Sequence, residues 1–225
     1  MTTTVRFGAK GGNEVAGELA EPSGTAKAPA VVLVQEYWGI NAHVKSLVDR
    51  LAKDGFLVVA PDLYHGKIAK DSAEAGKLMT ELDTGAAVQE IGAAVAYLRE
   101  HPRGNGKVGV IGFCLGGALT FASACHLPGL DAVVPFYGVP PADKVDYSKV
   151  TAPILAHFAK NDAWASVDKA EAIKKQVEAA GGSMQLEVYD AGHAFVNDTR
   201  PEAYDEKSAK LAWQRSVDFL KKHLA

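Results

Sequence analysis

The sequence of 225 residues contains only two cysteines, Cys114 and Cys125. If the segment between them is helical, a rise of about 1.5 Å per residue separates them by roughly 16 Å. A disulfide needs Cα atoms within about 7 Å of each other. The two thiols are therefore expected to stay reduced, which is typical of a cytoplasmic protein.

Long apolar runs and blocks of one charge sign are also absent. No run reaches the length of about 18 residues that indicates a membrane span, and segment 1–15 lacks the basic and then apolar order of a secretory signal. The formal net charge is only −3, whereas a nucleic-acid-binding face is usually strongly basic. We expect no membrane or nucleic-acid partner, and a monomer or weak homodimer in the cytoplasm.

Metal-ligand and phosphate-binding motifs are missing as well. The seven histidines show no H-E-x-x-H or comparable ligand spacing, and no G-K-S/T follows the glycines near 8–12. We therefore expect no metal ion and no cofactor. His65, His101 and His157 are interpreted as surface or packing residues, and Cys125 as a buried filler.

Short apolar runs and amphipathic stretches alternate along the chain. The runs are rich in Val, Ile and Leu, as in strands buried on both faces of a sheet, and they span 30–35, 56–60, 107–112, 131–138, 152–159 and 184–190. Helices are expected at 42–55, 83–102, 166–182 and 201–225, the last with Leu211, Val217 and Leu220 facing inward.

This alternation predicts an α/β fold with a mainly parallel central sheet and helices on both faces. Before residue 25, weak alternation around Gly11 and Gly12 predicts an antiparallel hairpin at the sheet edge. The chain has no repeat and no long linker. One domain over residues 1–225 is therefore expected.

The segment GVIGFCLGG places Cys114 between Gly112 and Gly116, where a strand pattern changes to a helix pattern. This G-x-C-x-G spacing is that of a nucleophile elbow with cysteine in the place of serine. The turn is so tight that side chains two residues either side would collide. The first helical amide, that of Leu115, could hold an oxyanion there. The alternative is a packed strand-helix junction with a filler cysteine.

Two further residues follow buried runs in the order that a catalytic triad requires. Asp162 follows the strand pattern at 152–159, and His193 follows the next strand. Sites of open α/β sheets form at such strand ends. His193 could take the thiol proton, and Asp162 could fix the imidazole tautomer. Taken singly, Asp162 could be a helix cap and His193 a surface-loop histidine.

Glu36 ends the apolar run 30–35, and a carboxylate in such a place needs a partner. It is either half of a structural ion pair or a group beside the thiol. Aromatic residues near the predicted strand ends could line a pocket for neutral, hydrophobic or aryl esters, or could be ordinary core packing. These residues are Tyr37, Trp38, Tyr64, Tyr137, Trp164 and Phe195.

Several segments resemble the dienelactone hydrolase family, from about residue 25 to 222. They are QEYWGIN (35–41), PDLY (61–64), NGKVGVIGFCLGGAL (105–119), FYG (136–138) and AGHAF (191–195). The resemblance implies an α/β-hydrolase fold with a Cys-His-Asp triad. It also implies that Glu36 takes the proton of Cys114 when substrate binds, and that the amides of Leu115 and Tyr37 form the oxyanion hole.

The sequence departs from this family where arginines hold the carboxylate of the small lactone. Asn197 stands four residues after His193, in the place of one such arginine, and segment 65–85 contains none. The lysines of that segment lack the planar fork of arginine, and each lost Arg-carboxylate hydrogen bond removes roughly 1.5–3 kcal/mol. Asn197 is therefore expected at the substrate site without the capacity to hold a small anion.

We therefore predict a hydrolase of carboxylic esters or lactones that works through a thioester. Cys114, His193, Asp162 and Glu36 are its expected catalytic residues. A small-molecule ester or lactone is its expected partner, with neutral or aryl substrates favoured over small anionic dienelactones. Two alternatives stay open: hydrolysis of activated phosphotriesters by the same cysteine, and a non-catalytic binding or redox-sensing protein on the same fold.

Overall fold

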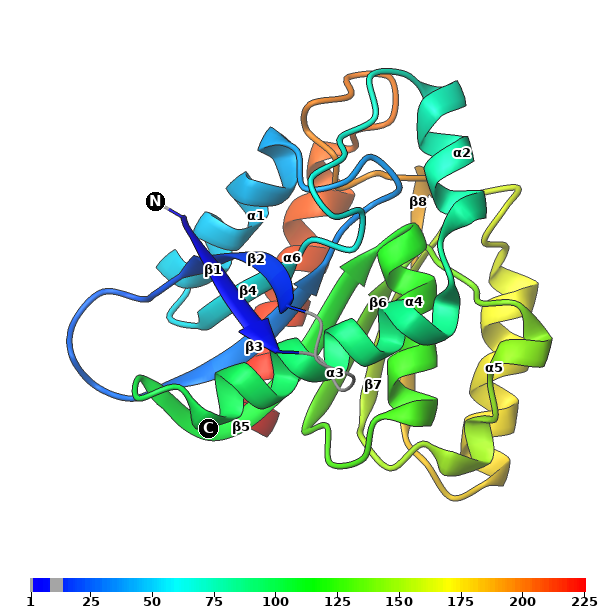
Figure 1. Ribbon diagram of the computed structural model, residues 1–225. Helices are drawn as coiled ribbons and strands as arrows, with labels where there is room; N and C mark the ends of the chain where they lie inside the picture. Colours follow the sequence, from blue (N-terminus) through cyan, green and yellow to red (C-terminus); the bar gives the residue numbers. More distant parts are fainter. Residues whose placement is uncertain (1, 9–13) are drawn as a thin grey trace.

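A computed structural model describes residues 2–8 and 14–225, and its framework is an eight-stranded sheet (Figure 1). The spatial order is β1-β2-β4-β3-β5-β6-β7-β8. The strands β3 to β8 pair in parallel, whereas β2 pairs antiparallel with β1 and β4. Their bounds are β1 Thr3–Gly8, β2 Glu14–Ala20, β3 Ala28–Val34, β4 Leu57–Pro61, β5 Gly104–Phe113, β6 Ala132–Phe136, β7 Ile154–Asn161 and β8 Met184–Gly192.

Helices cover both faces of this sheet. Helices α1 and α6 pack on one face, and α3, α4 and α5 pack on the other (Figure 1). Among the described helices, none has the length and apolar character that a membrane crossing needs. The bounds are α1 Ala42–Lys53, α2 Ser72–Glu81, α3 Thr84–Glu100, α4 Leu115–His126, α5 Val167–Ala179 and α6 Glu206–Leu224, with short 3-10 turns at Ala142–Lys144 and Tyr147–Lys149.

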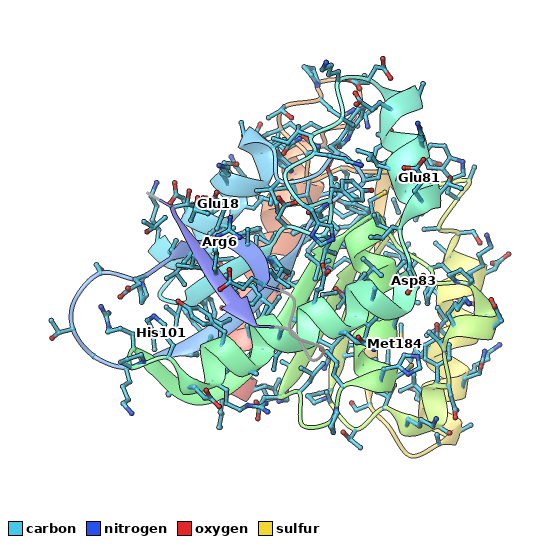
Figure 2. The ribbon with its side chains drawn as sticks, in the orientation of Figure 1. Arg6, Glu18, Glu81, Asp83, His101 and Met184 are labelled. Carbon is cyan, nitrogen blue, oxygen red and sulfur yellow. The ribbon has the colours of Figure 1, made fainter. Side chains whose placement is uncertain are left out.

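The predicted fold class is confirmed: the sheet is mainly parallel, has helices on both faces and begins with an antiparallel hairpin. The side chain of Glu18, labelled in Figure 2, anchors this hairpin. Its carboxylate accepts hydrogen bonds from Thr4 Oγ1 of β1 at 3.1 Å and from Lys45 Nζ of α1 at 3.0 Å. The expected turn at Gly11 and Gly12 lies outside the described residues.

The C-terminal helix is shorter than predicted. It begins at Glu206, not at residue 201, because the side chain of Asp205 caps the helix by accepting from Ser208 N at 2.7 Å. The prediction for Leu211 is wrong, since this residue is 44% exposed. The prediction for Val217 and Leu220 is confirmed, since both are buried. The buried stripe of α6 also includes Trp213 and small residues.

Helix α2 was not expected, since its pattern is weak. Only Ala75 and Leu78 of this helix are buried. Figure 1 shows α2 beyond the edge at which β5 and β6 end. The loop before it contacts the turn after β3, where Ala69 N donates to Trp38 O at 3.0 Å. Segment 65–85 therefore lies near the edge at which the triad residues were expected.

A buried histidine joins two strands to the last helix. His157 of β7 is fully buried, with Nδ1 at 2.8 Å from the Tyr189 hydroxyl of β8 and Nε2 at 3.0 Å from the Ser216 hydroxyl of α6. Its ring stacks on Phe136 with centroids 4.3 Å apart. Burial, with a smaller effect of the Arg215 charge, lowers the pKa of His157 to about 3. The ring is therefore neutral in the folded protein at pH 7.

This histidine should make the fold sensitive to acid. The unfolded chain binds a proton at His157 near pH 6.5, whereas the folded protein binds it only near pH 3. The contribution to stability is therefore complete above about pH 6.5 and is lost as the pH falls towards 3. Between pH 7.5 and pH 5 this loss amounts to about 2 kcal/mol.

We expect His157→Gln, which keeps polar contacts but does not titrate, to lose less stability over this interval than the wild type. Urea unfolding at the two pH values measures the difference. Equal losses in the two proteins would contradict the assignment.

Candidate active site

The backbone at Cys114 is strained. Its φ is +56° and its ψ is −113°, a region that residues other than glycine rarely occupy. Hydrogen bonds on both sides hold it there: Cys114 N donates to Phe136 O at 3.1 Å, and Cys114 O accepts from Ala118 N at 3.1 Å. Tyr137 and Ala194 also have positive φ values. Strain of this kind gathers at functional sites.

The glycines either side of Cys114 permit this turn. A Cβ atom on Gly112 would collide with the carbonyl oxygen of Gly116, and one on Gly116 would collide with the carbonyl oxygen of Val34. Both obstacles are backbone atoms and cannot move aside. Strand β5, helix α4 and strand β3 therefore approach closely only because these positions have no side chain.

Three residues from three loops meet at the carboxyl edge of the sheet. The Nε2 atom of His193 lies 3.1 Å from Cys114 Sγ, and its Nδ1 atom lies 2.6 Å from Asp162 Oδ2. Cys114 follows β5, Asp162 follows β7, and His193 follows β8. Because parallel strands end at the same edge, residues far apart in the sequence form one hydrogen-bonded line.

The electrostatics of this line favour a charged imidazole. Burial alone would lower the pKa of His193, but the hydrogen bonds to Asp162 and Cys114 raise it to about 10. At pH 7 the ring therefore holds a proton on each nitrogen. The Nδ1–H group donates to Asp162, and the Nε2–H group faces the sulfur.

Asp162 is held as a carboxylate. Its side chain is fully buried, and its Oδ1 atom accepts from the amides of Trp164 at 2.9 Å and Ala165 at 3.0 Å. Burial would raise the pKa of Asp162, but the hydrogen bonds from His193 and these amides hold it below its usual value. The carboxylate can therefore fix the orientation of the His193 ring.

Asn197, expected at the substrate site, contacts Glu36. Its side chain is buried, and Nδ2 donates to Glu36 Oε2 at 2.7 Å. Glu36 acts electrostatically on the same ring, that of Tyr137, as Cys114 does, and no hydrogen bond is found between its carboxyl group and Cys114 among the described residues. Burial raises the pKa of Glu36, opposed by the charge of His43 and by the Asn197 hydrogen bond. The amide of Asn197 therefore satisfies one oxygen of the Glu36 carboxyl group.

The two expected oxyanion donors stand on neighbouring segments. Leu115 is the first residue of α4, where the first amides of a helix have no acceptor within it. Tyr37 lies in the turn after β3, which Gly39 N closes by donating to Glu36 O at 3.3 Å. Gly116 packs against the end of β3, so both segments border Cys114.

Three of the six predicted aromatic residues lie near His193: one is exposed, one contacts the imidazole, and one is in the core. Trp164 is 71% exposed, and its ring lies edge-on to His193 with centroids 5.2 Å apart. Tyr137 contacts the same imidazole at 5.2 Å. Phe195 lies behind Tyr137 and is fully buried. The core therefore encloses its ring.

The other three aromatic residues, Tyr37, Trp38 and Tyr64, lie in or beside the turn after β3. Trp38 is half-buried and contacts Tyr37, with centroids 4.6 Å apart. Tyr64 is buried, and its hydroxyl has no hydrogen-bond partner among the described residues. Burial, and beyond it the nearby charge of Cys114, raises the pKa of Tyr64. Its hydroxyl is therefore a neutral donor near the sulfur.

Sequence reasoning missed a cation at this rim. Arg200 stands 5.7 Å from the centroid of the Trp38 ring, and its Nε donates to Glu202 Oε1 at 2.8 Å. Its charge also acts on Glu36. It stands seven residues after His193, outside the positions at which the resemblance implies an arginine.

His43 was missed as well. It is buried, with Nδ1 3.3 Å from Asp198 Oδ1. A histidine at the start of an amphipathic helix gives no signal of this contact. Within residues 2–8 and 14–225, no group of three or more His, Cys, Asp or Glu side chains is arranged to hold a metal ion.

An open, mainly parallel sheet with an elbow after β5, and with an aspartate and a histidine following in that order, defines the α/β-hydrolase class. The model of the dienelactone hydrolase family matches residues 15–224. The chain belongs to the dienelactone hydrolase family, and it is a hydrolase that acts on esters or lactones.

Two relatives and one solved structure are similar over nearly the whole chain. "Protein usf" of Aquifex pyrophilus is 37% identical, and the match covers 96% of both chains. The carboxymethylenebutenolidase of Pseudomonas putida is 33% identical, over 91% of this chain and 90% of that protein. A Klebsiella pneumoniae protein assigned to the dienelactone hydrolases has a TM-score of 0.86 at 26% identity, with 99% of both chains covered.

The elbow predicts a sharp contrast between two glycines. We expect Gly116→Ala to lower the free energy of unfolding by about 3 kcal/mol or more, because its Cβ meets fixed backbone. Gly76→Ala in α2 is the control, since a Cβ there meets nothing within 4 Å, and alanine in a helix should add roughly 0.5–1 kcal/mol. Urea unfolding compares the two, and similar stabilities would contradict the close approach.

Proposed function

We propose that the protein hydrolyses carboxylic esters or lactones through a thioester on Cys114. The observation that carries the proposal is His193, whose two nitrogens lie within hydrogen-bond distance of Cys114 Sγ and Asp162 Oδ2. A thiol, an imidazole and a carboxylate in one line are the parts of a nucleophilic triad.

In the first step, the Cys114 sulfur attacks the acyl carbon and the carbonyl π electrons move to oxygen. The amides of Leu115 and Tyr37 would stabilise this oxyanion. When the intermediate collapses, the bond to the alkoxide breaks, and His193 gives the alkoxide its Nε2 proton. The products of this half are an alcohol and a thioester on Cys114.

In the second step, His193 takes a proton from water, and the resulting hydroxide attacks the thioester carbon. The sulfur leaves as a thiolate. The carboxylic acid product loses its proton to solvent and departs. Asp162 keeps the imidazole in the required orientation throughout. The buried carboxyl group of Glu36 accepts a hydrogen bond from Asn197. In this scheme it influences the protonation of Cys114 and His193 electrostatically.

Removal of the sulfur tests the triad. We expect Cys114→Ala to lower kcat/KM for p-nitrophenyl butyrate by at least about 10³-fold, and His193→Ala to be nearly as severe. The wild type should release a burst of nitrophenolate equal to the enzyme concentration. Cys125→Ala is the matched control, since this thiol is buried on α4.

Two outcomes would contradict this proposal. Retained turnover in Cys114→Ala would place the chemistry at another residue. Stoichiometric oxidation of Cys114 by peroxide, with no nitrophenolate burst from any ester, would favour the redox-sensing alternative.

Neutral and aryl substrates should be favoured over small anions. Asn197 offers no charge at the position where the family has an arginine, and its amide is engaged with Glu36. Tyr137 and Trp164 present aromatic surface on either side of the His193 ring, which suits an aryl or hydrophobic group. Arg200, the cation near Trp38, is engaged with Glu202.

A matched pair of esters tests this preference. We expect kcat/KM for p-nitrophenyl butyrate to exceed that for p-nitrophenyl hemisuccinate by about tenfold or more, because no charged hydrogen bond offsets desolvation of the second carboxylate. Paraoxon, measured under the same conditions, tests the phosphotriester alternative. A preference for the hemisuccinate would contradict the proposal and would assign its carboxylate to Arg200.

A further inference from the structure

The indole of Trp164 lies beside His193 and faces solvent. Its ring is edge-on to the imidazole, with centroids 5.2 Å apart, and the residue is 71% exposed. Tyr137 stands at the same distance from the imidazole, but it is buried. Of these two rings, only that of Trp164 can therefore receive a group of an arriving substrate.

The triad carboxylate holds the backbone of Trp164 in this place. The amide of Trp164 donates to Asp162 Oδ1 at 2.9 Å, and the same oxygen accepts from Ala165 N at 3.0 Å. Lys169 Nζ donates to the Trp164 carbonyl oxygen at 3.0 Å. Single exposed apolar residues are ordinary, but this one is fixed by the group that also fixes His193. An indole supplies a large contact surface at a low entropic cost, which suits recognition of a ligand.

The order of the strands separates two sides of the sulfur. Strand β3 is next to β5 on one side, whereas β6, β7 and β8 follow on the other. The turn after β3 carries Tyr37, a proposed oxyanion donor, and the loops after β7 and β8 carry Trp164 and His193. An acyl carbon on Cys114 would therefore direct its carbonyl oxygen to the first side and its leaving group to the second.

The proposed reaction decides which half of the ester meets the indole. The acyl group stays bonded to Cys114 in the thioester, whereas the alkoxide must reach His193 Nε2 to take its proton. The side chain of His193 retains 18% exposure, so a substrate can reach it. A group that takes a proton from this small ring stands beside the indole that contacts it. The alcohol half is therefore the half expected on Trp164.

We propose that Trp164 forms a subsite for the alcohol half of the ester, and that this subsite also admits an aryl alcohol as acyl acceptor in place of water. The proposal rests on the thioester route described above. In the transfer, His193 takes the hydroxyl proton of the alcohol, and the alcohol oxygen attacks the thioester carbon. The bond to sulfur then breaks, and its electron pair stays on Cys114 as a thiolate. The product is a new ester.

Two butyrate esters whose leaving groups have similar basicity test the subsite. Trp164→Ala should lower the ratio of kcat/KM for benzyl butyrate to that for methyl butyrate by about tenfold, because the phenyl ring loses its aromatic contact. Trp164→Phe keeps an aromatic ring and should lower this ratio by less than about threefold. Leu211→Ala is the control, since it removes another exposed apolar side chain on α6. It should keep the wild-type ratio.

A change in the acyl half supplies the contrary arm of this experiment. Methyl phenylacetate carries its phenyl ring on the acyl side, so Trp164→Ala should not change the ratio of its kcat/KM to that of methyl butyrate. Equal losses for benzyl butyrate and methyl butyrate would assign Trp164 to the support of Asp162 and overturn the proposal. A comparable loss for methyl phenylacetate and benzyl butyrate would overturn it too, because the indole would then not distinguish the two halves.

Acyl transfer is measured with p-nitrophenyl butyrate and benzyl alcohol in one reaction. Gas chromatography at early times gives the ratio of benzyl butyrate to butyric acid. Relative to the same measurement with methanol as acceptor, this ratio should fall about tenfold in Trp164→Ala. If the wild type forms no benzyl butyrate, or if the ratio is the same in both proteins, the acceptor role is refuted.

Binding of an alcohol without turnover separates this inference from the proposed hydrolysis. The Cys114→Ala variant is titrated with p-nitrobenzyl alcohol, whose nitroaryl ring quenches indole fluorescence. The quenching should be saturable, and it should be lost when Trp164→Phe is added. Saturable quenching together with retained ester turnover in Cys114→Ala would refute the thioester route and leave the subsite in place. Loss of turnover in Cys114→Ala without saturable quenching would refute the subsite alone.

Discussion

The site depends on the close backbone contact between β3, β5 and α4 at the elbow. Cys114 can occupy a positive φ only because Gly112 and Gly116 present no side chain to the carbonyl groups that they face. The turn lifts the sulfur out of the sheet and directs it towards the loop after β8. It also places the first amide of α4 beside the same atom. The nucleophile and one of its proposed donors are therefore consequences of a single steric condition.

The second requirement is a line of hydrogen bonds that crosses three loops. Asp162 is fixed by two backbone amides, His193 by Asp162, and the sulfur by His193. Each member is partly or fully buried, so the interactions act with little screening by water. This explains why the pKa of His193 rises although burial alone would lower it. The imidazole beside the sulfur is therefore positively charged at pH 7.

Around this line of hydrogen bonds lie two neutral polar side chains, those of Asn197 and Tyr64. The amide of Asn197 occupies the position of a family arginine, yet it contacts a carboxyl group of the protein. Tyr64 supplies a buried hydroxyl near the sulfur. Arg200 is the nearby cation, and it already has Glu202 as a partner. The proposed nucleophile lies in an elbow that resembles the family's, while Asn197 stands where the resemblance places an arginine.

The sequence alone determined the strand and helix alternation, the elbow and the order of the triad, because these depend on local patterns of apolar and small residues. It did not determine α2 or the exposure of Leu211, where local patterns are weak or mislead. Only the tertiary structure decided that Asn197 contacts Glu36, since 161 positions separate them in the chain. Contacts between distant polar residues depend on how loops meet at the sheet edge, and no local pattern encodes that meeting.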